Sequence, residues 1–248
     1  MGARAPARRA HDWWHPRRWL SAKELTALTV LSLLAGGLWV FILLAQYVNK
    51  GQVSRFDERI VRALRSASDP ADPLGPRWFE ETMRDFTALG GFAVLGALSA
   101  AAILYLVLIK KRGTALMAFV SIAGGVVVSL LLKDFFDRPR PDLVPHGQHV
   151  YTKSFPSGHA MLSAVTYLTL GAVLARVQAR RLLKLYVIAL ALLTALLVGA
   201  SRVYLGVHWP SDVLAGWAAG SVWALAVWGV THLLQRTGDI EPEPAEEA

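Results

Sequence analysis

The chain has 248 residues, of which 54% are hydrophobic and only 18% are charged, and its mean hydropathy is +0.39. This composition is too apolar for an ordinary soluble domain of this length and indicates a membrane protein. The absence of cysteine excludes disulfides and thiolate metal sites. The net charge of +8 does not indicate a nucleic-acid partner, because much of the basic charge lies between apolar runs, where membrane topology and anionic headgroups explain it.

Six apolar stretches approach or exceed the roughly 20 helical residues that cross a bilayer. The first three contain no charged residue, the fourth contains only His159 as a titratable group, and the fifth is framed by Lys184 and Arg202. Six buried helices of a soluble core are disfavoured, because no polar helix faces alternate with the apolar ones. The sequence therefore predicts an all-α polytopic membrane bundle with six transmembrane helices, over 25–48, 86–109, 113–132, 154–175, 185–201 and 213–235.

Lysine and arginine residues near the ends of these stretches predict the orientation of the bundle. They concentrate before the first stretch, in Lys110-Lys111-Arg112, and in the loop 176–184, which has no acidic residue. These regions lie on one side of a six-span chain and are predicted to be cytoplasmic, in the inner or plasma membrane of the cell. The predicted organisation is a basic cytoplasmic segment over 1–23, a six-span domain over 24–235 and an acidic cytoplasmic tail over 236–248.

A short amphipathic helix is predicted in the first outer loop. Phe56, Ile60, Val61 and Leu64 share one helical face, with arginines on the other. Two interpretations stay open: a helix on the membrane surface beside a substrate entrance, or a helix packed on the outer ends of the spans.

Three polar clusters lie at the ends of spans on the side opposite to the predicted cytoplasmic loops. They cover 133–141, 156–159 and 201–212. Polar residues at such positions are costly and therefore point to function. Because all three clusters face one compartment, we expect an active site at the outer membrane face.

The contents of these clusters suit phosphoryl transfer. Lys133, Arg140 and Arg202 supply three cations that can hold a phosphate and the charge on its equatorial oxygens. Ser157 and Gly158 precede a predicted helix, whose N-terminal N–H groups and dipole favour an anion.

Two histidines and one aspartate complete the set. His208 and Asp212 are four residues apart where Pro210 can start a helix, so the carboxylate is within reach of the imidazole. A carboxylate on one ring nitrogen leaves the other basic for attack, and His159 can protonate a leaving oxygen. Singly, each group has an ordinary explanation, such as a snorkelling cation or a helix cap; their convergence on one side of one bundle favours an active site.

The three clusters resemble the signature of the type-2 phosphatidic acid phosphatase (PAP2, or lipid phosphate phosphatase) superfamily. That signature is Lys-x6-Arg-Pro, then Pro-Ser-Gly-His, then Ser-Arg-x5-His-x3-Asp. Lys133 to Arg140-Pro141, Pro156 to His159 and Ser201 to Asp212 match it in order and spacing. Of the two Arg-Pro pairs, Arg140 falls in register and Arg138 does not.

The resemblance implies roles for these residues. His208 would be the nucleophile that forms a phosphohistidine, oriented by Asp212, and His159 would be first the acid and then the base. The phosphate would be bound by Lys133, Arg140, Ser157, Gly158 and Arg202, with no metal or other cofactor. Neither the nearby acids Asp134, Asp137 and Asp142 nor the pair His146 and His149 is interpreted as a metal site.

The sequence therefore predicts an integral membrane lipid phosphatase, whose partners are a lipid phosphate substrate and membrane lipids. Phosphatidic acid, phosphatidylglycerophosphate and undecaprenyl diphosphate all fit as substrates, and the oligomeric state stays open. One alternative is a vanadium-dependent haloperoxidase, which shares the pattern, although those relatives resemble large soluble proteins. Another is a non-catalytic lipid-binding or transport protein, disfavoured by the intact His208, Asp212 and His159.

Overall fold

The computed structural model describes residues 22–50, 55–136, 138–141, 153–238 and 240. The predicted basic segment up to residue 21, the tail from residue 241, and Asp137, Asp142, His146 and His149 lie outside these ranges. Within the described part the chain is all-α, with one isolated β-bridge between Arg65 and Pro73. The eight helices are α1 (Ala22–Asn49), α2 (Arg55–Ala63), α3 (Arg77–Ala88), α4 (Phe92–Leu108), α5 (Arg112–Phe135), α6 (Gly158–Arg176), α7 (Arg181–Tyr204) and α8 (Pro210–Thr237).

Five helices, α1, α5, α6, α7 and α8, are long and apolar enough to cross a membrane, and the bent pair of α3 and α4 makes a sixth if it counts as one span. These helices confirm the predicted membrane bundle. The stretch 86–109, however, is not the continuous helix that its composition predicts. The chain bends by 48° between Ala88 and Phe92, where Gly90 and Gly91 are poor helix formers.

The bend is fixed by contacts with the rest of the bundle. The Tyr167 hydroxyl donates a hydrogen bond of 2.9 Å to the carbonyl of Leu89. Gly90 is buried so tightly that a Cβ atom there would lie 2.4 Å from Cγ1 of Val198 and 3.2 Å from Cδ2 of His159. The bend therefore brings the chain close to the start of α6, where a predicted site residue lies.

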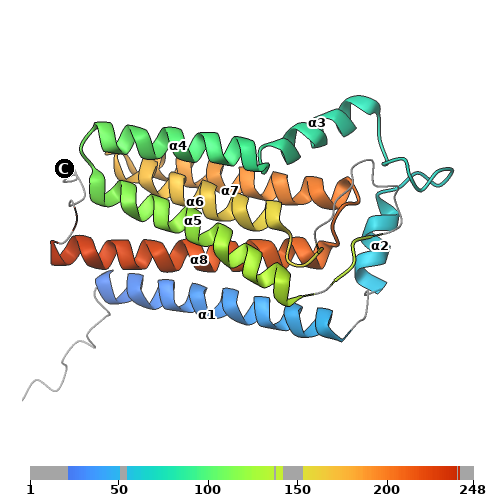
Figure 1. Ribbon diagram of the computed structural model, residues 1–248, viewed down its shortest axis with the longest axis horizontal. Helices are drawn as coiled ribbons and strands as arrows, with labels where there is room; N and C mark the ends of the chain where they lie inside the picture. The colour runs from blue at the N-terminus through green and yellow to red at the C-terminus, as the bar shows by residue number, and fades with distance from the viewer. Residues whose placement is uncertain (1–21, 51–54, 137, 142–152, 239, 241–248) are drawn as a thin grey trace, which may run out of the picture.

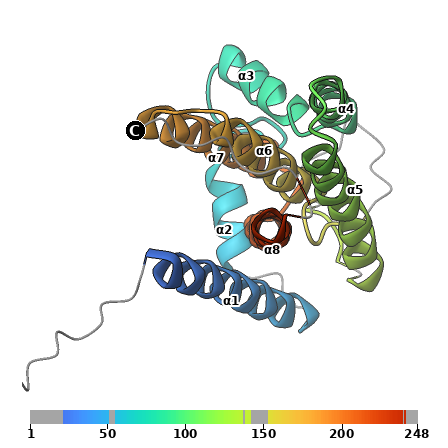
Figure 2. The ribbon, with the colours of Figure 1, turned by 90° about the vertical axis from the view of Figure 1, so that its left-hand side faces the viewer.

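The spans run in alternating directions around α8, which contacts α1, α5, α6 and α7 (Figures 1 and 2). Helices α1, α5 and α7 end, and α4, α6 and α8 begin, at the end of the bundle that carries α2 and α3 (Figure 1). We call this the α2/α3 end. All three polar clusters predicted from the sequence belong to it.

The short helix α2 packs on the spans. Its buried residues are Asp57 and Val61, whereas Phe56 remains 55% exposed. The Asp57 carboxylate accepts a 3.0 Å hydrogen bond from the backbone N–H of Ser211 in the first turn of α8. Of the two interpretations that the sequence left open, the structure supports packing on the ends of the spans.

Two glycines allow α8 to approach α6 closely. A Cβ atom on Gly216 would lie 2.7 Å from the carbonyl oxygen of Ser157, and one on Gly220 would lie 2.5 Å from that of Met161. Small residues four apart commonly permit such contacts between membrane helices. The spacing of α6 and α8, which carry the second and third polar clusters, therefore depends on these glycines.

Gly220→Ala is expected to destabilise the fold by about 1–3 kcal/mol, because the new methyl group meets a backbone oxygen that can move only with α6. Gly229→Ala is the matched control, since it lies on the same helix with open space around it. Thermal unfolding in detergent measures the difference. Equal unfolding temperatures for the two variants would contradict the proposed role of this contact.

Candidate active site

Most of the predicted site residues line a cavity of about 160 Å³ at the α2/α3 end. It is lined by Lys133, Arg140, Gly158, His159, Arg202 and His208, together with Ser129, Gly90 and four apolar side chains. None of the described residues that line it is acidic. Ser157 and Asp212, the two other predicted residues, are fully buried and do not line it. The cavity is therefore strongly cationic and of a size that suits a small anionic group.

His208 is held between α7 and α8. Gly206 has a positive φ of 70°, a conformation that favours glycine, and it turns the chain after α7 so that His208 points inward. The His208 side chain is 1% exposed, and its Nδ1 lies 3.4 Å from Oδ2 of Asp212. Asp212 is in the first turn of α8 and also accepts a 3.0 Å hydrogen bond from the backbone N–H of Trp209. The Asp212 carboxylate therefore contacts both the His208 imidazole and the backbone of Trp209, and so stabilises the loop between α7 and α8.

The other ring nitrogen of His208 faces the cavity. Nε2 lies 3.1 Å from an Nη atom of Arg140, which also donates a 2.8 Å hydrogen bond to the carbonyl of Val207. With the Nδ1 proton directed at Asp212, Nε2 carries the lone pair. This nitrogen can therefore attack an electrophile that the Arg140 guanidinium holds beside it.

Behind the histidine lies a buried ionic network that the sequence analysis did not identify. Arg138 is paired with the Asp212 carboxylate on one side, and on the other it donates a 2.8 Å hydrogen bond to Asp57 of α2. Ser211 Oγ accepts from Arg138 at 2.7 Å and lies 2.6 Å from Oδ2 of Asp57, to which it donates. The Ser154 hydroxyl donates a hydrogen bond to the Asp212 carboxylate. The orientation of Asp212 is thus set by several partners from distant parts of the chain.

Two residues of the second cluster, Gly158 and His159, line the cavity at the start of α6. Ser157 is the N-cap of α6 and accepts a 3.5 Å hydrogen bond from the backbone N–H of Ala160. A Cβ atom on Gly158 would lie 3.2 Å from Cε of Lys133, so the absence of a side chain lets the lysine approach the helix start. Nζ of Lys133 donates a 3.1 Å hydrogen bond to the carbonyl of Lys153. The Lys133 ammonium therefore lies at the N-terminus of α6, and the cation and the helix N-terminus both favour a bound anion.

Arg202, in the last turn of α7, completes the cationic wall. One of its Nη atoms donates a 2.8 Å hydrogen bond to the hydroxyl of Thr87 in α3. Its Nε is buried and has no hydrogen-bond partner among the described residues. Thr87 and Gly90, which the sequence analysis also missed, lie at the bend between α3 and α4. The bend therefore contacts Arg202 through Thr87 and packs close to His159 at Gly90.

Burial lowers the pKa of His208 to about 3; the hydrogen bond with Asp212 opposes this shift, and the charge of Arg140 adds to it. The imidazole is therefore neutral near neutral pH, which is the state that a nucleophile requires. Burial also lowers the pKa of Arg140 from its ordinary value, against the charge of Asp212.

The low pKa of His208 predicts a loss of stability in acid. An unfolded histidine titrates near pH 6.5, so below that pH the unfolded chain binds a proton that the folded chain refuses until about pH 3. This stabilising contribution is present above pH 6.5 and falls by about 1.4 kcal/mol for each pH unit below it. We expect the unfolding temperature of the wild type to drop more steeply between pH 7 and pH 5 than that of His208→Asn. Parallel slopes would contradict a buried neutral His208.

A helical membrane bundle with a cationic cavity beside a buried His–Asp pair defines a class of membrane-embedded phosphatase, and comparison with known proteins identifies the family. The chain belongs to the PAP2 superfamily, whose family model matches residues 114–236. It is 30% identical to phosphatidylglycerophosphatase B of Bacillus subtilis over 199 residues, which are 79% of this chain and 93% of the relative.

Two further similarities agree with this assignment. The crystal structure of a transmembrane PAP2-type phosphatidylglycerolphosphate phosphatase from Bacillus subtilis superimposes with a TM-score of 0.74 and 29% identity, covering 82% of this chain and 98% of that one. An undecaprenyl-diphosphatase of Sulfolobus acidocaldarius is 43% identical over 68 residues, 27% of this chain and 29% of the relative. The chain is thus a multi-pass membrane phosphatase of the PAP2 family.

Proposed function

We propose that the protein removes the terminal phosphate of phosphatidylglycerophosphate through a phosphohistidine formed on His208. The observation that carries this proposal is the arrangement around His208. One nitrogen faces a buried carboxylate, and the other faces a cavity lined by Lys133, Arg140 and Arg202.

The reaction proceeds in two displacements. Nε2 of His208 attacks phosphorus and the bond to the lipid oxygen breaks, while His159 gives its proton to that oxygen. In the second step His159 takes a proton from water, the resulting hydroxide attacks phosphorus, and inorganic phosphate leaves His208. Asp212 stabilises the imidazolium that forms when His208 is phosphorylated, as the aspartate of a catalytic triad does.

The three cations stabilise the charge that spreads over the equatorial oxygens in the transition state. The buried Nε of Arg202 is a donor for one of them, and Gly158 allows the start of α6 to approach another. Ser157 contributes by capping α6. We propose that these groups supply the positive charge that a metal ion supplies in other phosphatases.

A lipid substrate is supported by the wall of the cavity. Phe92 on α4 and Leu130 on α5 line it, yet they are 67% and 54% exposed on helices that cross the membrane. Such side chains face acyl chains in a bilayer. A lipid can therefore reach His208 from the membrane, between α4 and α5, with its phosphate toward the cations.

Phosphatidylglycerophosphate is favoured because the relative named for it aligns with most of both chains. Undecaprenyl diphosphate is the second candidate, supported by the higher identity of the undecaprenyl-diphosphatase over its shorter match.

The substrate is tested by measuring phosphate release from each lipid in nanodiscs, with EDTA present throughout. We expect kcat/KM for phosphatidylglycerophosphate to exceed that for undecaprenyl diphosphate and phosphatidic acid by about tenfold or more, as differential transition-state binding requires. EDTA should leave the rate unchanged. Equal hydrolysis of water-soluble glycerol phosphate would contradict a lipid substrate, and restoration of activity by Mg²⁺ would contradict the cationic mechanism.

We further propose that the active site lies on the outer side of the cell membrane and both termini are cytoplasmic, with 24–235 as the phosphatase domain. Seven basic residues and no acidic ones lie in 109–112 and 176–184, at the end opposite to the site, and such residues favour the cytoplasm. A reporter after Lys153 should be external, and one after Gln178 should be cytoplasmic. The reverse result would overturn this orientation.

A further inference from the structure

A second and larger cavity lies at the opposite end of the bundle, away from His208. It has a volume of about 450 Å³ and is lined by residues of α5, α6, α7 and α8, together with Val30 of α1. Arg176, one of its lining residues, is the last residue of α6, whose first residue, Gly158, lines the active-site cavity. The 18 helical steps between them span about 27 Å, close to the thickness of the hydrocarbon core.

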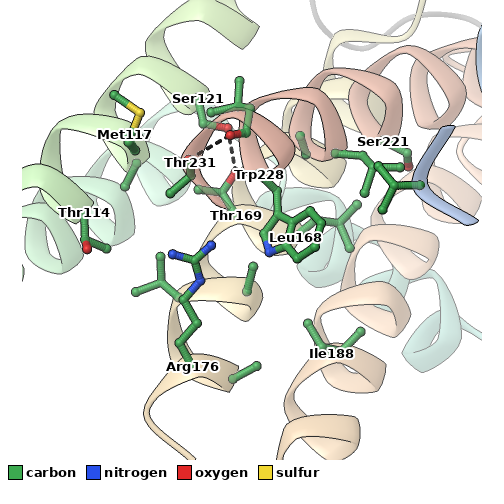
Figure 3. A pocket seen from close by; sticks show the side chains of 18 of the residues that line it. Thr114, Met117, Ser121, Leu168, Thr169, Arg176, Ile188, Ser221, Trp228 and Thr231 are labelled. Atoms are coloured by element: carbon green, nitrogen blue, oxygen red, sulfur yellow. Dashed lines mark hydrogen bonds between the residues drawn. The ribbon is translucent and has the colours of Figure 1, made fainter. Parts of the chain in front are cut away.

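The walls of this cavity are mainly apolar, and the charged groups in them are all cationic. Arg176 and Lys184 are the charged groups among the described lining residues, and none of those residues is acidic. In Figure 3 the Arg176 side chain extends from α6 into the cavity, with Ile188, Leu168 and Trp228 around the same space. The hydroxyls of Ser121 and Thr169 are 2.7 Å apart, and Thr169 lies about two helical turns before Arg176 on α6.

We propose that this cavity binds an anionic phospholipid from the membrane leaflet at that end. The volume lies in the range of ligand pockets, about 300–1,000 Å³. A void of this size in a bilayer is filled by acyl chains, because they give its lining atoms the dispersion attraction that an empty space cannot. The distance from Leu168 to Arg176 along α6, about 12 Å, lets a chain extend from the headgroup level toward the bilayer centre.

Charge selects the headgroup. Arg176 is the last residue of α6 and Lys184 lies in the first turn of α7, so we expect both side chains at the level of the lipid phosphates. Basic pockets between membrane helices bind anionic headgroups. Phosphatidylcholine brings a quaternary ammonium group next to these cations, whereas phosphatidylglycerol carries no cationic group. The site is separate from the catalytic cavity and therefore does not depend on the proposed reaction.

The test uses phosphatidylglycerol or phosphatidylcholine that carries a photoactivatable diazirine on its acyl chain, in nanodiscs with the full chain. After illumination, digestion and mass spectrometry locate the labelled peptides. We expect phosphatidylglycerol to label 168–176 or 224–231 about tenfold more than phosphatidylcholine, the size of effect that one charge-assisted contact gives. The same labelling by both lipids, or no labelling of these segments, would overturn the proposal.

Three variants separate the contributions. Arg176→Gln with Lys184→Gln should lower labelling by phosphatidylglycerol about tenfold or more. Arg180→Gln with Arg181→Gln, the same charge change on exposed neighbours outside the cavity, should not change it. Ala172→Phe should abolish labelling by filling the cavity without changing charge. If the two charge variants lose equal amounts of labelling, the lipid is attracted by surface charge alone. If Ala172→Phe retains labelling, the acyl chain of the lipid lies outside the cavity. Either result overturns the proposal. Phosphate release, measured in parallel, reports separately on the catalytic end.

Discussion

Replacement of His208 by alanine is expected to abolish phosphate release, with a loss on the order of 10⁴–10⁶ in kcat. Losses of this size are seen when the nucleophile is removed from a set of catalytic residues that act together. The loss should be the same for every leaving group, because no phosphoenzyme can form. His232→Ala is the matched control: it changes the same residue type on α8, far from the cavity, where His232 stacks on Trp228. Substantial turnover by His208→Ala with a good leaving group would contradict this mechanism.

His159→Ala should behave differently, because its effect depends on how much help the leaving oxygen needs. With a lipid alkoxide, the expected loss is on the order of 10²–10⁴. With a nitrophenyl phosphate, whose leaving group needs no proton, the first step should be partly rescued while hydrolysis of the phosphoenzyme stays slow. A burst of nitrophenolate followed by a slow steady rate identifies this pattern. An equal loss with both substrates would contradict the role of His159 as an acid.

The second large effect is expected at Arg138, which does not line the cavity. Arg138→Met removes the cation shared by two carboxylates that are fully buried, Asp57 and Asp212. Breaking a buried ion pair on one side costs about 3–5 kcal/mol, so this variant is expected to be strongly destabilised. The conservative change Arg138→Lys keeps the charge but not the geometry, because the guanidinium bonds Asp212 and Asp57 through two separate nitrogen atoms and an ammonium group has only one.

We therefore expect Arg138→Lys to fold with modest loss of stability but to lose about 10–100-fold in kcat, as changes in residues that orient a catalytic group commonly do. KM should remain close to the wild-type value, since Lys133, Arg140 and Arg202 are unchanged. Arg84→Lys on α3, paired with Glu80, is the matched control. An unchanged kcat in a folded Arg138→Lys protein would show that the network supports stability alone.

The sequence predicted the bundle well because the physics of membrane helices is local. Each span is a long apolar run that must satisfy its own backbone hydrogen bonds, so α1, α5, α6, α7 and α8 lie where the composition places them. The three polar clusters were predictable for the same reason, since charged side chains at span ends are conspicuous. The structure places Arg140, and not Arg138, in the cavity, as the motif spacing indicates; the roles of the site residues stay predictions.

The residues that sequence analysis missed are those whose importance arises from tertiary contacts. Asp57 is one of several acids in the first outer loop, and nothing local marks it as the partner of Arg138, 81 residues away. Thr87 and Gly90 act through a bend that a hydropathy profile shows as one continuous apolar run. Arg138 did carry a signal in the sequence, because Arg138-Pro139 repeats the Arg-Pro pattern of Arg140-Pro141 two residues earlier. Only the fold shows that Arg138 turns away from the cavity toward Asp212.

If His208 is the nucleophile, it carries the phosphoryl group between the two steps, and the most direct measurement is to locate that group in the chain. His159→Ala should be mixed with substrate, quenched without acid, digested and analysed by mass spectrometry, because phosphohistidine is retained under these conditions when its hydrolysis lacks a base. We predict an added phosphoryl group on the peptide that contains His208, and none when His208 is also replaced. A phosphoryl group on another residue, or labelling of His208→Ala but not of His159→Ala, would contradict the mechanism proposed for this phosphatase.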